Sequence, residues 1–483
     1  PYFPLFPPYL VMFLLLDIGS TYTKALIVRN GSLVAQGVGL TTVDSDVSVG
    51  VRNAVQNALG SEFTFHVSRF RQILVCSSAA GGLKIVAIGR TASLTAHAAR
   101  QAALGAGGKV VGAFVGALND EQVRDIERLR PDVILLTGGT DGGDTTTIVH
   151  NAKMIADSRW RCPIVVAGNA AAREQVASTL NSHPSTLLVV DNVLPEPDRL
   201  HLAPAREAIR QVFAQHIIEA KGLHKVRAMT ARDIIPTPAA VLNAAQLIAE
   251  HLGELMVVDV GGATTDVHSV ADGAPKRLNV ISHPDAADEP YVKRTVEGDL
   301  GMRVSALTVW ATAGAAAVCK KAGVSATEQD RAHEVVARFA REVSTLPQTA
   351  FEQQVEIGLG RACVTLAVER HVGRLSVGDG RINVIVQTGK DLSHVRNIIG
   401  TGGVFAHSPH AATMLTEAAA SAPDSVVLKP HRPTLWLDTR YVLWAVGLLS
   451  QVDKEGAWKL AESSLRPVDY DRGGHHSRGN HSA

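Results

Sequence analysis

The sequence predicts an α/β protein with two lobes of similar topology. An apolar strand runs into Asp-x-Gly and then into small and hydroxyl residues twice, at residues 15–24 and 257–266. Later in each half a buried strand ends in Thr-Gly-Gly, at Thr137 and at Thr401. Strands of this kind alternate with helical stretches. This alternation indicates largely parallel sheets with sites at the carboxyl ends of the strands.

The composition excludes several classes of protein. The 483 residues are enough for two or three domains with sizeable cores. The 47 Lys and Arg balance 46 Asp and Glu, so neither a nucleic acid nor a membrane surface is expected as a partner. The four cysteines are scattered without a CxxC motif, which argues against a zinc site or a disulfide framework. A reducing, cytoplasmic location fits this cysteine usage.

The first half of the chain is expected to form a meander followed by alternating strands and helices. Residues 1–12 are rich in Pro and aromatic residues and lack the features of a signal peptide, so we interpret them as an N-terminal extension. The turn at Asn30-Gly31 favours a hairpin. The expected strands are 13–16, 25–28, 32–37, 73–76, 133–136 and 164–166, and the expected helices are 47–59 and 205–222.

The second half repeats the scheme. A helix over 239–251 precedes a strand at 255–260, a glycine turn and a strand at 267–270. Further helices are expected at 301–321, 327–345 and 349–371, and further strands at 384–387 and 397–399.

The spacing of the motifs predicts the domain boundaries. Asp17 and Thr137 are 120 residues apart, and Asp259 and Thr401 are 142 apart, an excess of 22 (142 − 120). This excess is close to the length of the polar, Pro-containing stretch 272–295. We therefore interpret the chain as an internal duplication. It comprises a first lobe (13–240), a second lobe (241–450) with an insert (272–295), and a C-terminal segment (451–483) that ends in a disordered tail.

The paired turns carry the candidate catalytic chemistry. Asp17 and Asp259 are the candidate catalytic and metal-ligating residues, because Mg²⁺ prefers oxygen ligands and keeps several of its waters. Glycines let backbone N–H groups approach phosphate oxygens, and hydroxyls add further hydrogen bonds. The candidate phosphate-binding residues are Gly19, Ser20, Thr21, Thr23 and Lys24 in the first copy and Gly261, Gly262, Thr264 and Thr265 in the second. Asp266 stands where Lys24 falls in the first copy, so the two lobes are not equivalent.

Three other motifs complete the candidate site. Gly400, Thr401, Gly402 and Gly403 are expected to lie against adenine and ribose, since glycines let a flat ring approach the backbone. Glu297, Gly298 and Asp299 precede a predicted helix, where Asp299 is also a good N-cap. The turn at 137–143 is expected to be the first lobe's counterpart of 400–403, with Asp141 as a weaker site candidate.

These motifs resemble those of the actin-like ATPase superfamily, in which two lobes of duplicated topology enclose ATP. DIGSTYTK at 17–24 is similar to its first phosphate motif, DVGGATTD at 259–266 to its second, and GTGG at 400–403 to its adenosine motif. Together with SSAAGG at 77–82, LLTGGTDGG at 135–143 and EGDLGMR at 297–303, they resemble the glutamate mutase accessory protein family, GlmL or MutL. The resemblance spans about residues 13–450.

The resemblance implies a function. A member of this family is expected to bind and hydrolyse ATP with Mg²⁺ and to act on the subunits of an adenosylcobalamin-dependent mutase such as glutamate mutase. Such a reactivating factor would open the mutase by lobe closure and release damaged cofactor. The resemblance to the superfamily also implies that Glu297, Gly298 and Asp299 contact the nucleoside.

Other functions stay open on the sequence alone. A small-molecule kinase of the same fold needs a general base near the acceptor hydroxyl, for which Asp141 and Asp266 are the candidates. An electron-donating activator of 2-hydroxyacyl-CoA dehydratases shares the DxGSTxxK pattern but needs cysteines that bind a bridging iron–sulfur cluster. A scaffold that keeps the fold without ATP hydrolysis is a further alternative.

Overall fold

The computed structural model describes residues 12–468 apart from several internal gaps. The gaps are 20, 43–44, 61–65, 67–68, 79–82, 92–98, 100–101, 103–107, 182–184, 198, 220–221, 231, 283–288, 378–383 and 423–424. The candidate residue Ser20, the predicted extension up to residue 11 and the predicted tail from 469 therefore lie outside the described residues.

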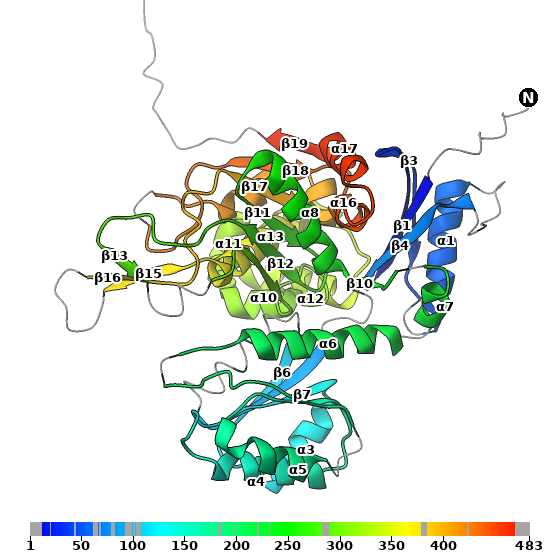
Figure 1. Ribbon diagram of the computed structural model, residues 1–483. Coiled ribbons are helices and arrows are strands. Elements are labelled where there is room, and N and C mark those ends of the chain that lie inside the picture. The colour runs from blue at the N-terminus through cyan, green and yellow to red at the C-terminus, as the bar shows by residue number, and fades with distance from the viewer. Residues whose placement is uncertain are drawn as a thin grey trace, which may run out of the picture.

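The first lobe is a five-stranded sheet in the order β10-β4-β1-β2-β3 (Figure 1). Strands β1 and β2 are antiparallel and joined by the candidate phosphate turn, and β1 and β4 are parallel. Asn30 and Gly31 both have positive φ, as the predicted hairpin requires. The elements are β1 (Met12–Ile18), β2 (Tyr22–Arg29), β3 (Ser32–Leu40), β4 (Gln72–Ser77) and β10 (Ile235–Pro236), with α1 (Val47–Leu59) and α7 (Leu223–Arg227) packed on the outer face.

The second lobe repeats this topology. Its six-stranded sheet has the order β14-β12-β11-β17-β18-β19, so β18-β17-β11-β12-β14 correspond to β10-β4-β1-β2-β3. Strands β11 and β12 are antiparallel and β11 and β17 are parallel, as in the first lobe. The predicted two-lobed, duplicated fold is confirmed. The strands are β11 (Leu255–Val260), β12 (Thr265–Val270), β14 (Val292–Glu297), β17 (Asn397–Thr401), β18 (Thr434–Asp438) and β19 (Leu465–Val468).

Two helices of equivalent position join the lobes. Helix α8 (Thr237–Leu252) follows β10, and α16 (Leu443–Leu449) follows β18. Both contribute to one apolar core between the two sheets, together with α17 (Lys454–Ser464). At their crossing a Cβ on Gly447 would overlap the carbonyl oxygen of Ala240, so only glycine fits there. This close crossing brings the backbones of the two helices into direct contact.

An additional α/β unit is inserted in the first lobe between β4 and α7, and it lies below the two lobes in Figure 1. Its parallel sheet has the order β6-β5-β7-β8-β9. The elements are β5 (Leu83–Gly89), β6 (Gly108–Val115), β7 (Val133–Leu136), β8 (Ile164–Val166), β9 (Leu187–Val189), α3 (Asp120–Leu129), α4 (Thr146–Asp157), η2 (Ala170–Ala172), α5 (Arg173–Leu180) and α6 (Ala203–Glu219).

This unit overturns one prediction. The turn at 137–143 follows β7, which pairs with β5 and β8 and not with β1. The strand that lies parallel to β1, as β17 lies parallel to β11, is β4, so the counterpart of 400–403 is the turn that begins at Ser77. The prediction was wrong because a short, fully buried parallel strand has the same apolar pattern in either sheet.

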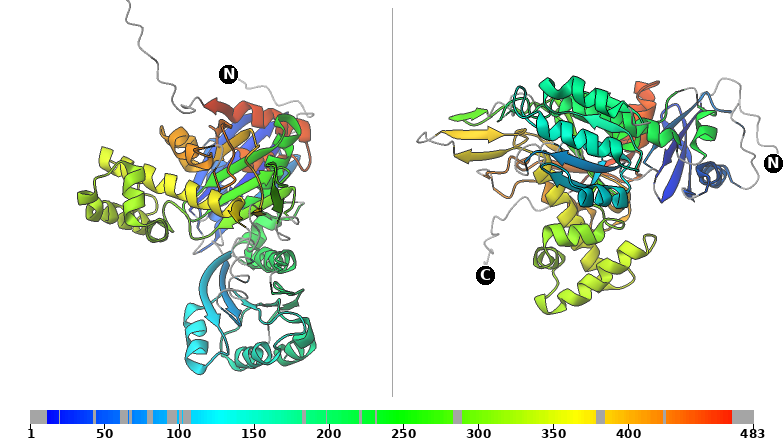
Figure 2. Two further views of the ribbon diagram at one scale, coloured as in Figure 1. Left: turned by 90° about the vertical axis from the view of Figure 1, so that its left-hand side faces the viewer. Right: turned by 90° about the horizontal axis from the view of Figure 1, so that it is seen from below.

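The second lobe carries two excursions. Four helices, α10 (Ala306–Ala313), α11 (Ala315–Ala322), α12 (Gln329–Arg341) and α13 (Ala350–His371), pack on its far face and project from the molecule (Figure 2). The predicted helix 301–321 is broken at Gly314, whose φ is +84°. A three-stranded sheet of β13 (Val280–Ser282), β16 (Ile385–Thr388) and β15 (Arg374–Val377) projects at another edge. The remaining short elements are η3 (Ala326–Glu328), α14 (Gly403–His407), α15 (Ala411–Leu415) and η4 (Thr416–Ala418).

Two predicted boundaries differ from the structure. The insert 272–295 includes β13, but Val292 already belongs to β14 of the main sheet, so the excursion ends earlier than predicted. Strand β19 pairs with β18, so the second lobe's sheet extends past residue 450.

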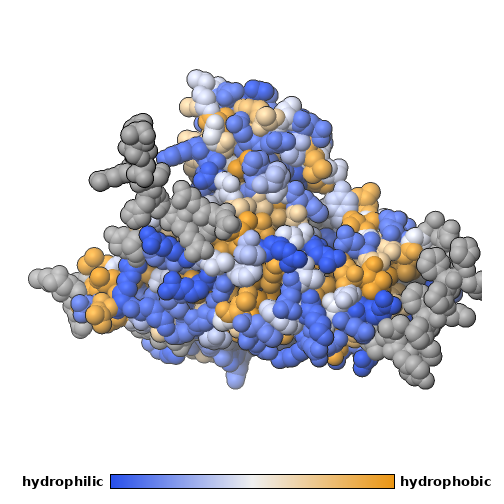
Figure 3. All heavy atoms as spheres, turned by 90° about the horizontal axis from the view of Figure 1, so that it is seen from above, coloured by the Kyte–Doolittle hydropathy of each residue, from blue (hydrophilic) through white to orange (hydrophobic). Residues whose placement is uncertain are grey.

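Apolar side chains gather where the three-stranded sheet projects, at the left end of Figure 3. Among the described residues no helix is both long and apolar enough to span a membrane.

Candidate functional site

The two Asp-x-Gly motifs fold into the same turn. In the first, the N–H of Gly19 donates to the carbonyl of Tyr22 at 3.1 Å, and in the second, the N–H of Gly261 donates to that of Thr264 at 2.9 Å. The strand register is equivalent as well. Asp17 lies opposite Lys24, and Asp259 lies opposite Asp266. The two turns are therefore structural copies whose cross-strand partners differ in charge.

Lys24 connects the first turn to the second lobe. Its Nζ donates to Asp17 Oδ2 at 2.7 Å and lies 4.1 Å from the ring centroid of Tyr441, which belongs to the turn between β18 and α16. Burial acts to lower the pKa of Lys24, but the Asp17 carboxylate and Tyr441 outweigh it and hold this pKa above its usual value. Lys24 therefore carries a positive charge at the junction of the lobes.

The two aspartates belong to one electrostatic site. Burial, together with the charges of Asp17 and Asp438, raises the pKa of Asp259 to about 7 against the opposing charge of Lys24. Because Asp17 and Lys24 from the first lobe act on Asp259 in the second, the paired turns face a common space. Asp259 is 8 % exposed and Asp17 only 1 %, so both carboxylates are largely shielded from water.

Two further elements, α8 and β4, also hold Asp17. Thr237, the first residue of α8, donates its hydroxyl to Asp17 Oδ1 at 2.8 Å. The Cys76 thiol of β4 contacts the same oxygen at 3.6 Å, and burial raises the pKa of this thiol. With Lys24 on Oδ2, the Asp17 carboxylate has a defined orientation. The sequence did not single out Thr237 or Cys76, because strand pairing brings them to the site from distant segments.

Asp266 makes the second turn strongly acidic. Burial, followed by the charge of Asp259, holds the pKa of Asp266 well above its usual range. Its Oδ2 accepts a long hydrogen bond of 3.4 Å from Thr264, while its buried Oδ1 has no hydrogen-bond partner among the described residues. A buried pair of facing carboxylates with an unsatisfied oxygen is the kind of donor set that a hard cation stabilises.

The Gly402 turn lies directly against Asp259. A Cβ on Gly402 would come within 2.5 Å of the Val260 carbonyl oxygen and 2.7 Å of Asp259 Oδ1, and its φ is +106°. Gly403 is different, because a Cβ there would meet nothing within 4 Å. Gly400 packs against core side chains and Gly402 is buried against Asp259, so Gly403 is the glycine of this turn with open space beside its backbone.

Asp438 organises this side of the site and was missed by the sequence analysis. It accepts hydrogen bonds from the Thr401 hydroxyl at 2.8 Å, from the N–H groups of Val442 and Leu443 at 3.0 and 2.9 Å, and from the Ser464 hydroxyl. Thr401 is thus turned toward Asp438 rather than toward a ligand. An Asp shortly before a helix is the only sequence signal for this role.

Two predicted phosphate ligands point away from the turns. Thr23 is fully buried and its hydroxyl bonds to that of Thr41 at 2.9 Å, while Thr265 is also fully buried. Both follow strand alternation, which places them on the sheet face opposite Lys24 and Asp266. The prediction that they wrap the phosphates is therefore contradicted. Gly19, Thr21, Gly262 and Thr264 remain at least partly exposed in the turns, and Gly261 lies beside them.

The segment 297–303 is hydrogen-bonded to the backbone of the second turn. The N–H groups of Met302 and Arg303 donate to the carbonyls of Gly261 and Gly262 at 3.1 and 2.8 Å. Arg370 binds Glu297 at 2.7 Å and both carboxylate oxygens of Asp299 at 2.7 and 2.9 Å. Burial raises the pKa of Glu297, while Arg370 opposes the shift.

The role of Asp299 as a helix N-cap is not supported. The next helix, α10, begins only at Ala306, after Ser305. The Ser305 hydroxyl donates to the carbonyls of Ala263 at 2.7 Å and Gly298 at 3.4 Å, which joins the Glu297–Asp299 segment to the turn. The structure therefore brings Glu297, Gly298 and Asp299 next to the second turn, with both carboxylates held by Arg370.

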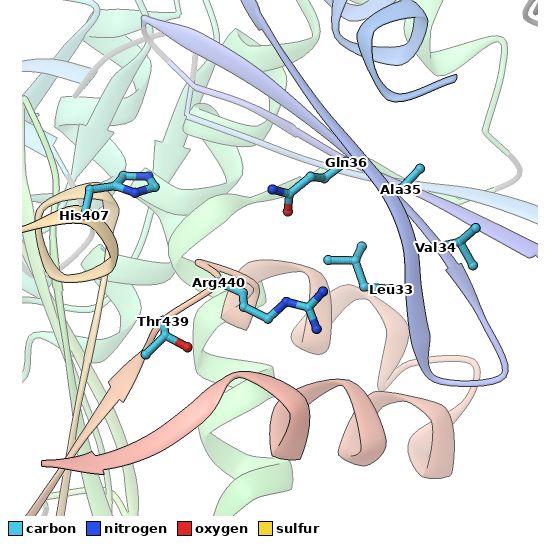
Figure 4. Close-up of a pocket in the computed structure, with 7 residues that line it drawn as sticks. All are labelled: Leu33, Val34, Ala35, Gln36, His407, Thr439 and Arg440. Atoms are coloured by element: carbon cyan, nitrogen blue, oxygen red, sulfur yellow. The ribbon is translucent and has the colours of Figure 1, made fainter. Parts of the chain in front are cut away.

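A small cavity lies between the lobes (Figure 4). Its volume is about 370 Å³, and it is lined by Leu33, Val34, Ala35, Gln36, His407, Thr439 and Arg440. Gln36 of the first lobe and His407 of the second point toward one another across it. Arg440 directly precedes Tyr441, so the cavity and the Lys24 contact share one turn of the chain.

The donor set matches the requirements of Mg²⁺ better than those of a transition metal. Within the described residues no three His, Cys, Asp or Glu side chains converge as a ready-made metal site. Mg²⁺ does not need one, because it is usually held by one or two carboxylates, several waters and the phosphates of a substrate. The buried carboxylates of Asp17, Asp259 and Asp266 fit this mode of binding.

Comparisons with known proteins identify the family. The family model described as MutL protein matches residues 13–465. Protein MutL of Clostridium tetanomorphum is 40% identical over 466 residues, which cover 94% of this chain and 99% of that protein. Among solved structures, a glycerol dehydratase reactivase aligns with a TM-score of 0.34 and 11% identity over 91% of this chain and 99% of its own. The nucleotide-free acetone carboxylase aligns with a TM-score of 0.39 and 13% identity over 94% and 70%.

At these TM-scores the solved structures add nothing to the assignment. The family match and the MutL relative each cover nearly the whole chain, including both phosphate turns and the glycine turn at 400–403. The motifs that resemble the glutamate mutase accessory family therefore lie within the matched region. The chain belongs to the MutL protein family.

Proposed function

We propose that this protein binds ATP with Mg²⁺ between its lobes, hydrolyses it, and acts as the accessory, reactivating protein of an adenosylcobalamin-dependent mutase. The observation that carries the ATP part is the pair of turns with the same hydrogen bond and strand register, in which the charge of Asp17 acts on Asp259 across the lobe junction. Membership of the MutL family, together with the resemblance of the motifs to the glutamate mutase accessory proteins, supports the choice of partner.

The residues divide the work between the lobes. The N–H groups of the Gly19 and Gly261 turns and the hydroxyls of Thr21 and Thr264 would bind the terminal phosphates, and Lys24 would add a positive charge from the first lobe. Bound Mg²⁺ would supply charge neutralisation at the phosphates. Asp17, held by Thr237, would orient the water shell of the cation.

Asp259 is the best candidate for the general base. Its pKa of about 7 is matched to accepting a proton from water near neutral pH. Asp266 lies opposite Asp259 on the neighbouring strand. A water placed between the carboxylate and the terminal phosphate would transfer its proton to Asp259 as its oxygen attacks phosphorus, while the bond from phosphorus to the bridging oxygen breaks and ADP leaves.

Lobe movement would couple hydrolysis to the partner. ATP that contacts both lobes stabilises the closed arrangement by its differential affinity for it. Loss of the terminal phosphate removes the contact between the turns, and the lobes relax. The Gly447–Ala240 crossing of α8 and α16 is the connection across which such a movement would pass.

The first experiment measures phosphate release from Mg-ATP by the purified protein. Asp17→Ala and Asp259→Ala should each lower the rate by about 100-fold or more, the usual scale for loss of a positioned acid–base group. Asp330→Ala, at an exposed position of α12, is the matched control and should keep the wild-type rate. Hydrolysis that survives in both site variants would exclude this site as the ATPase centre.

The second experiment tests the partner. The full-length protein is used to capture proteins from the native cell extract with and without Mg-ATP, and captured proteins are tested for subunits of a cobalamin-dependent mutase. The mutase should be recovered in a nucleotide-dependent manner, and mutase inactivated during turnover should regain activity when this protein and Mg-ATP are added. If reactivation does not depend on the added protein, the reactivating role is wrong even where ATP hydrolysis is present.

A further inference from the structure

Tyr441 contacts the phosphate-binding lysine of the opposite lobe. It belongs to the turn between β18 and α16, and its ring centroid lies 4.1 Å from Lys24 Nζ of β2. A cation over an aromatic face at this distance is attracted by the ring quadrupole. Lys24 also donates to Asp17 at 2.7 Å. Lys24 is thus held by a carboxylate of its own lobe and by a ring of the other.

The backbone at Tyr441 is strained. Its φ is +53°, in the left-handed region that bulky side chains rarely adopt. Such a conformation persists where the surroundings over-determine it, and it often marks a functional position. Here the N–H of Tyr441 donates to the Asp438 carbonyl at 3.2 Å, and its carbonyl accepts from Trp444 Nε1 at 2.9 Å. The turn therefore aims the ring at Lys24 at a conformational cost.

The strained turn is tied to the nucleotide side of the second lobe. The Asp438 carboxylate binds the N–H groups of Val442 and Leu443 and also the hydroxyl of Thr401. Thr401 directly precedes Gly402, which lies against Asp259. A displacement of Tyr441 would therefore act on the Gly402 turn through a single carboxylate.

We propose that Tyr441 is a positioning residue that holds Lys24 in the nucleotide-free protein through a cation–π contact. When phosphates bind, Lys24 moves to them and this contact is lost. Occupancy of the phosphate site therefore controls a contact between the lobes. This inference rests on the proposed binding of ATP. A charge-assisted hydrogen bond to a phosphate oxygen is stronger than a cation–π contact, so a bound phosphate takes Lys24 from the ring. Tyr441 opposes nucleotide binding by the strength of the contact that is lost.

The test measures the dissociation constant of a non-hydrolysable ATP analogue with Mg²⁺. Tyr441→Leu removes the aromatic face and should tighten binding about 2- to 30-fold, which is the range for a cation–π contact of about 0.5–2 kcal/mol. Tyr441→Phe keeps the ring and removes only the hydroxyl, which also interacts with Lys24, so it should tighten binding less than Tyr441→Leu does. Tyr441→Asn is a second ring-less variant that tolerates the positive φ, and it should tighten binding like Tyr441→Leu. Tyr291→Leu, at an exposed tyrosine, is the control and should leave the affinity unchanged.

A double-mutant cycle separates this role from general packing. In a Lys24→Met background the ring has no cation to hold, so Tyr441→Leu should no longer change the dissociation constant. Equal tightening with and without Lys24, or no tightening by either ring-less variant in the wild-type background, overturns the proposal while leaving ATP binding intact. A wild-type protein that binds no nucleotide overturns both this inference and the proposed function.

Discussion

At the scale of single residues, one cross-strand substitution distinguishes the two turns. The first copy pairs Asp17 with Lys24, and the second pairs Asp259 with Asp266. The sequence predicts this difference, since it depends only on counting seven positions along a hairpin. The charge state of Asp259 was not predictable in the same way, because burial and the charges of Asp17 and Asp438 come from three separate segments.

The raised pKa of Asp259 makes the stability of the nucleotide-free protein depend on pH. An unfolded aspartate has a pKa of about 4, while that of Asp259 in the folded protein is about 7. The folded state therefore binds the proton more tightly. This contribution to stability is fully present below pH 4 and is lost as pH rises through 7. Asp259→Asn should remove part of the decline in melting temperature between pH 5 and pH 8.

Melting temperatures across this pH range check the prediction. The matched control, Asp330→Asn on the exposed face of α12, should keep the wild-type pH dependence. A wild-type melting curve that rises from pH 5 to pH 8 and is shifted by the same amount at every pH in Asp259→Asn would contradict the assignment. Mg²⁺ should reduce the decline in the wild type, because a cation stabilises the ionised carboxylate.

Replacing Asp266 is expected to raise the stability of the protein but to weaken its use of Mg²⁺ in ATP hydrolysis. Its buried Oδ1 has no hydrogen-bond partner among the described residues, and the charge of Asp259 lies on the neighbouring strand. Asp266→Asn relieves this repulsion, so the nucleotide-free protein should become more stable at pH 8. The same change removes a carboxylate from the proposed cation site, so the Mg²⁺ concentration for half-maximal ATP hydrolysis should rise about tenfold.

Differential scanning calorimetry and a magnesium titration of phosphate release give the two measurements. Asp272→Asn, at an exposed aspartate outside the site, is the comparison for the magnesium titration and should leave the magnesium requirement unchanged. A destabilised Asp266→Asn protein with a normal magnesium requirement would assign Asp266 a structural role in the hairpin.

At the scale of elements, substitutions at two neighbouring glycines, Gly402 and Gly403, distinguish a role in packing from a role in ligand contact. A Cβ at Gly402 would collide with Val260 and Asp259 on a backbone with φ of +106°, whereas a Cβ at Gly403 meets nothing within 4 Å. Gly402→Ala should therefore lower the free energy of unfolding by about 1–3 kcal/mol and displace Asp259. Gly403→Ala should leave stability nearly unchanged and weaken nucleotide binding if adenosine lies against this turn.

Urea unfolding and nucleotide titration of both variants provide the measurement. A stable Gly402→Ala protein would mean that the turn adapts without loss. An unaltered affinity in Gly403→Ala would place the adenosine elsewhere in the cleft.

The elements also show where sequence patterns stop being informative. The Asn30-Gly31 hairpin and the strand predicted at 397–399, which is β17 (Asn397–Thr401), were found, because their turn residues and apolar runs are local signals. The partner strand of β1 was not, since β4 and β7 are both short and fully buried but join different sheets. Thr23 and Thr265 were assigned to the phosphates by their place in a motif, but strand alternation turns their side chains away.

At the scale of the whole molecule, the duplicated lobes and an excursion within 272–295 were predictable, but the α/β unit inserted in the first lobe was not. The paired motifs predict two lobes, because each motif is a complete strand–turn–strand unit. The five-stranded unit from β5 to β9 has its own core and leaves no mark in the spacing of those motifs. The interval of 120 residues from Asp17 to Thr137 ends inside this inserted unit. Subtracting it from the Asp259–Thr401 interval therefore does not give the length of the insert in the second lobe.

The last prediction concerns the surface that meets the partner, which we place on the projecting sheet of β13, β16 and β15. Exposed apolar side chains gather on this sheet and in the turn before β13, with Val377 at 78 % and Leu278 at 93 % exposure, on a feature that projects from the second lobe (Figures 1 and 3). Apolar groups in a projecting patch favour association with a partner. Deleting 272–295 would also remove part of β14, so point substitutions are the sharper test.

Leu278→Ser combined with Val377→Ser should abolish nucleotide-dependent capture of the mutase while ATP hydrolysis by the isolated protein stays at the wild-type rate. Both side chains are exposed, so the fold should lose little stability when they are replaced. Leu346→Ser, at 66 % exposure between α12 and α13, is the matched control and should retain capture. If capture survives the double substitution but fails in Leu346→Ser, the partner binds the projecting helices instead. The lobe movement would then reach it through α13, whose Arg370 holds Glu297 and Asp299 beside the second phosphate turn.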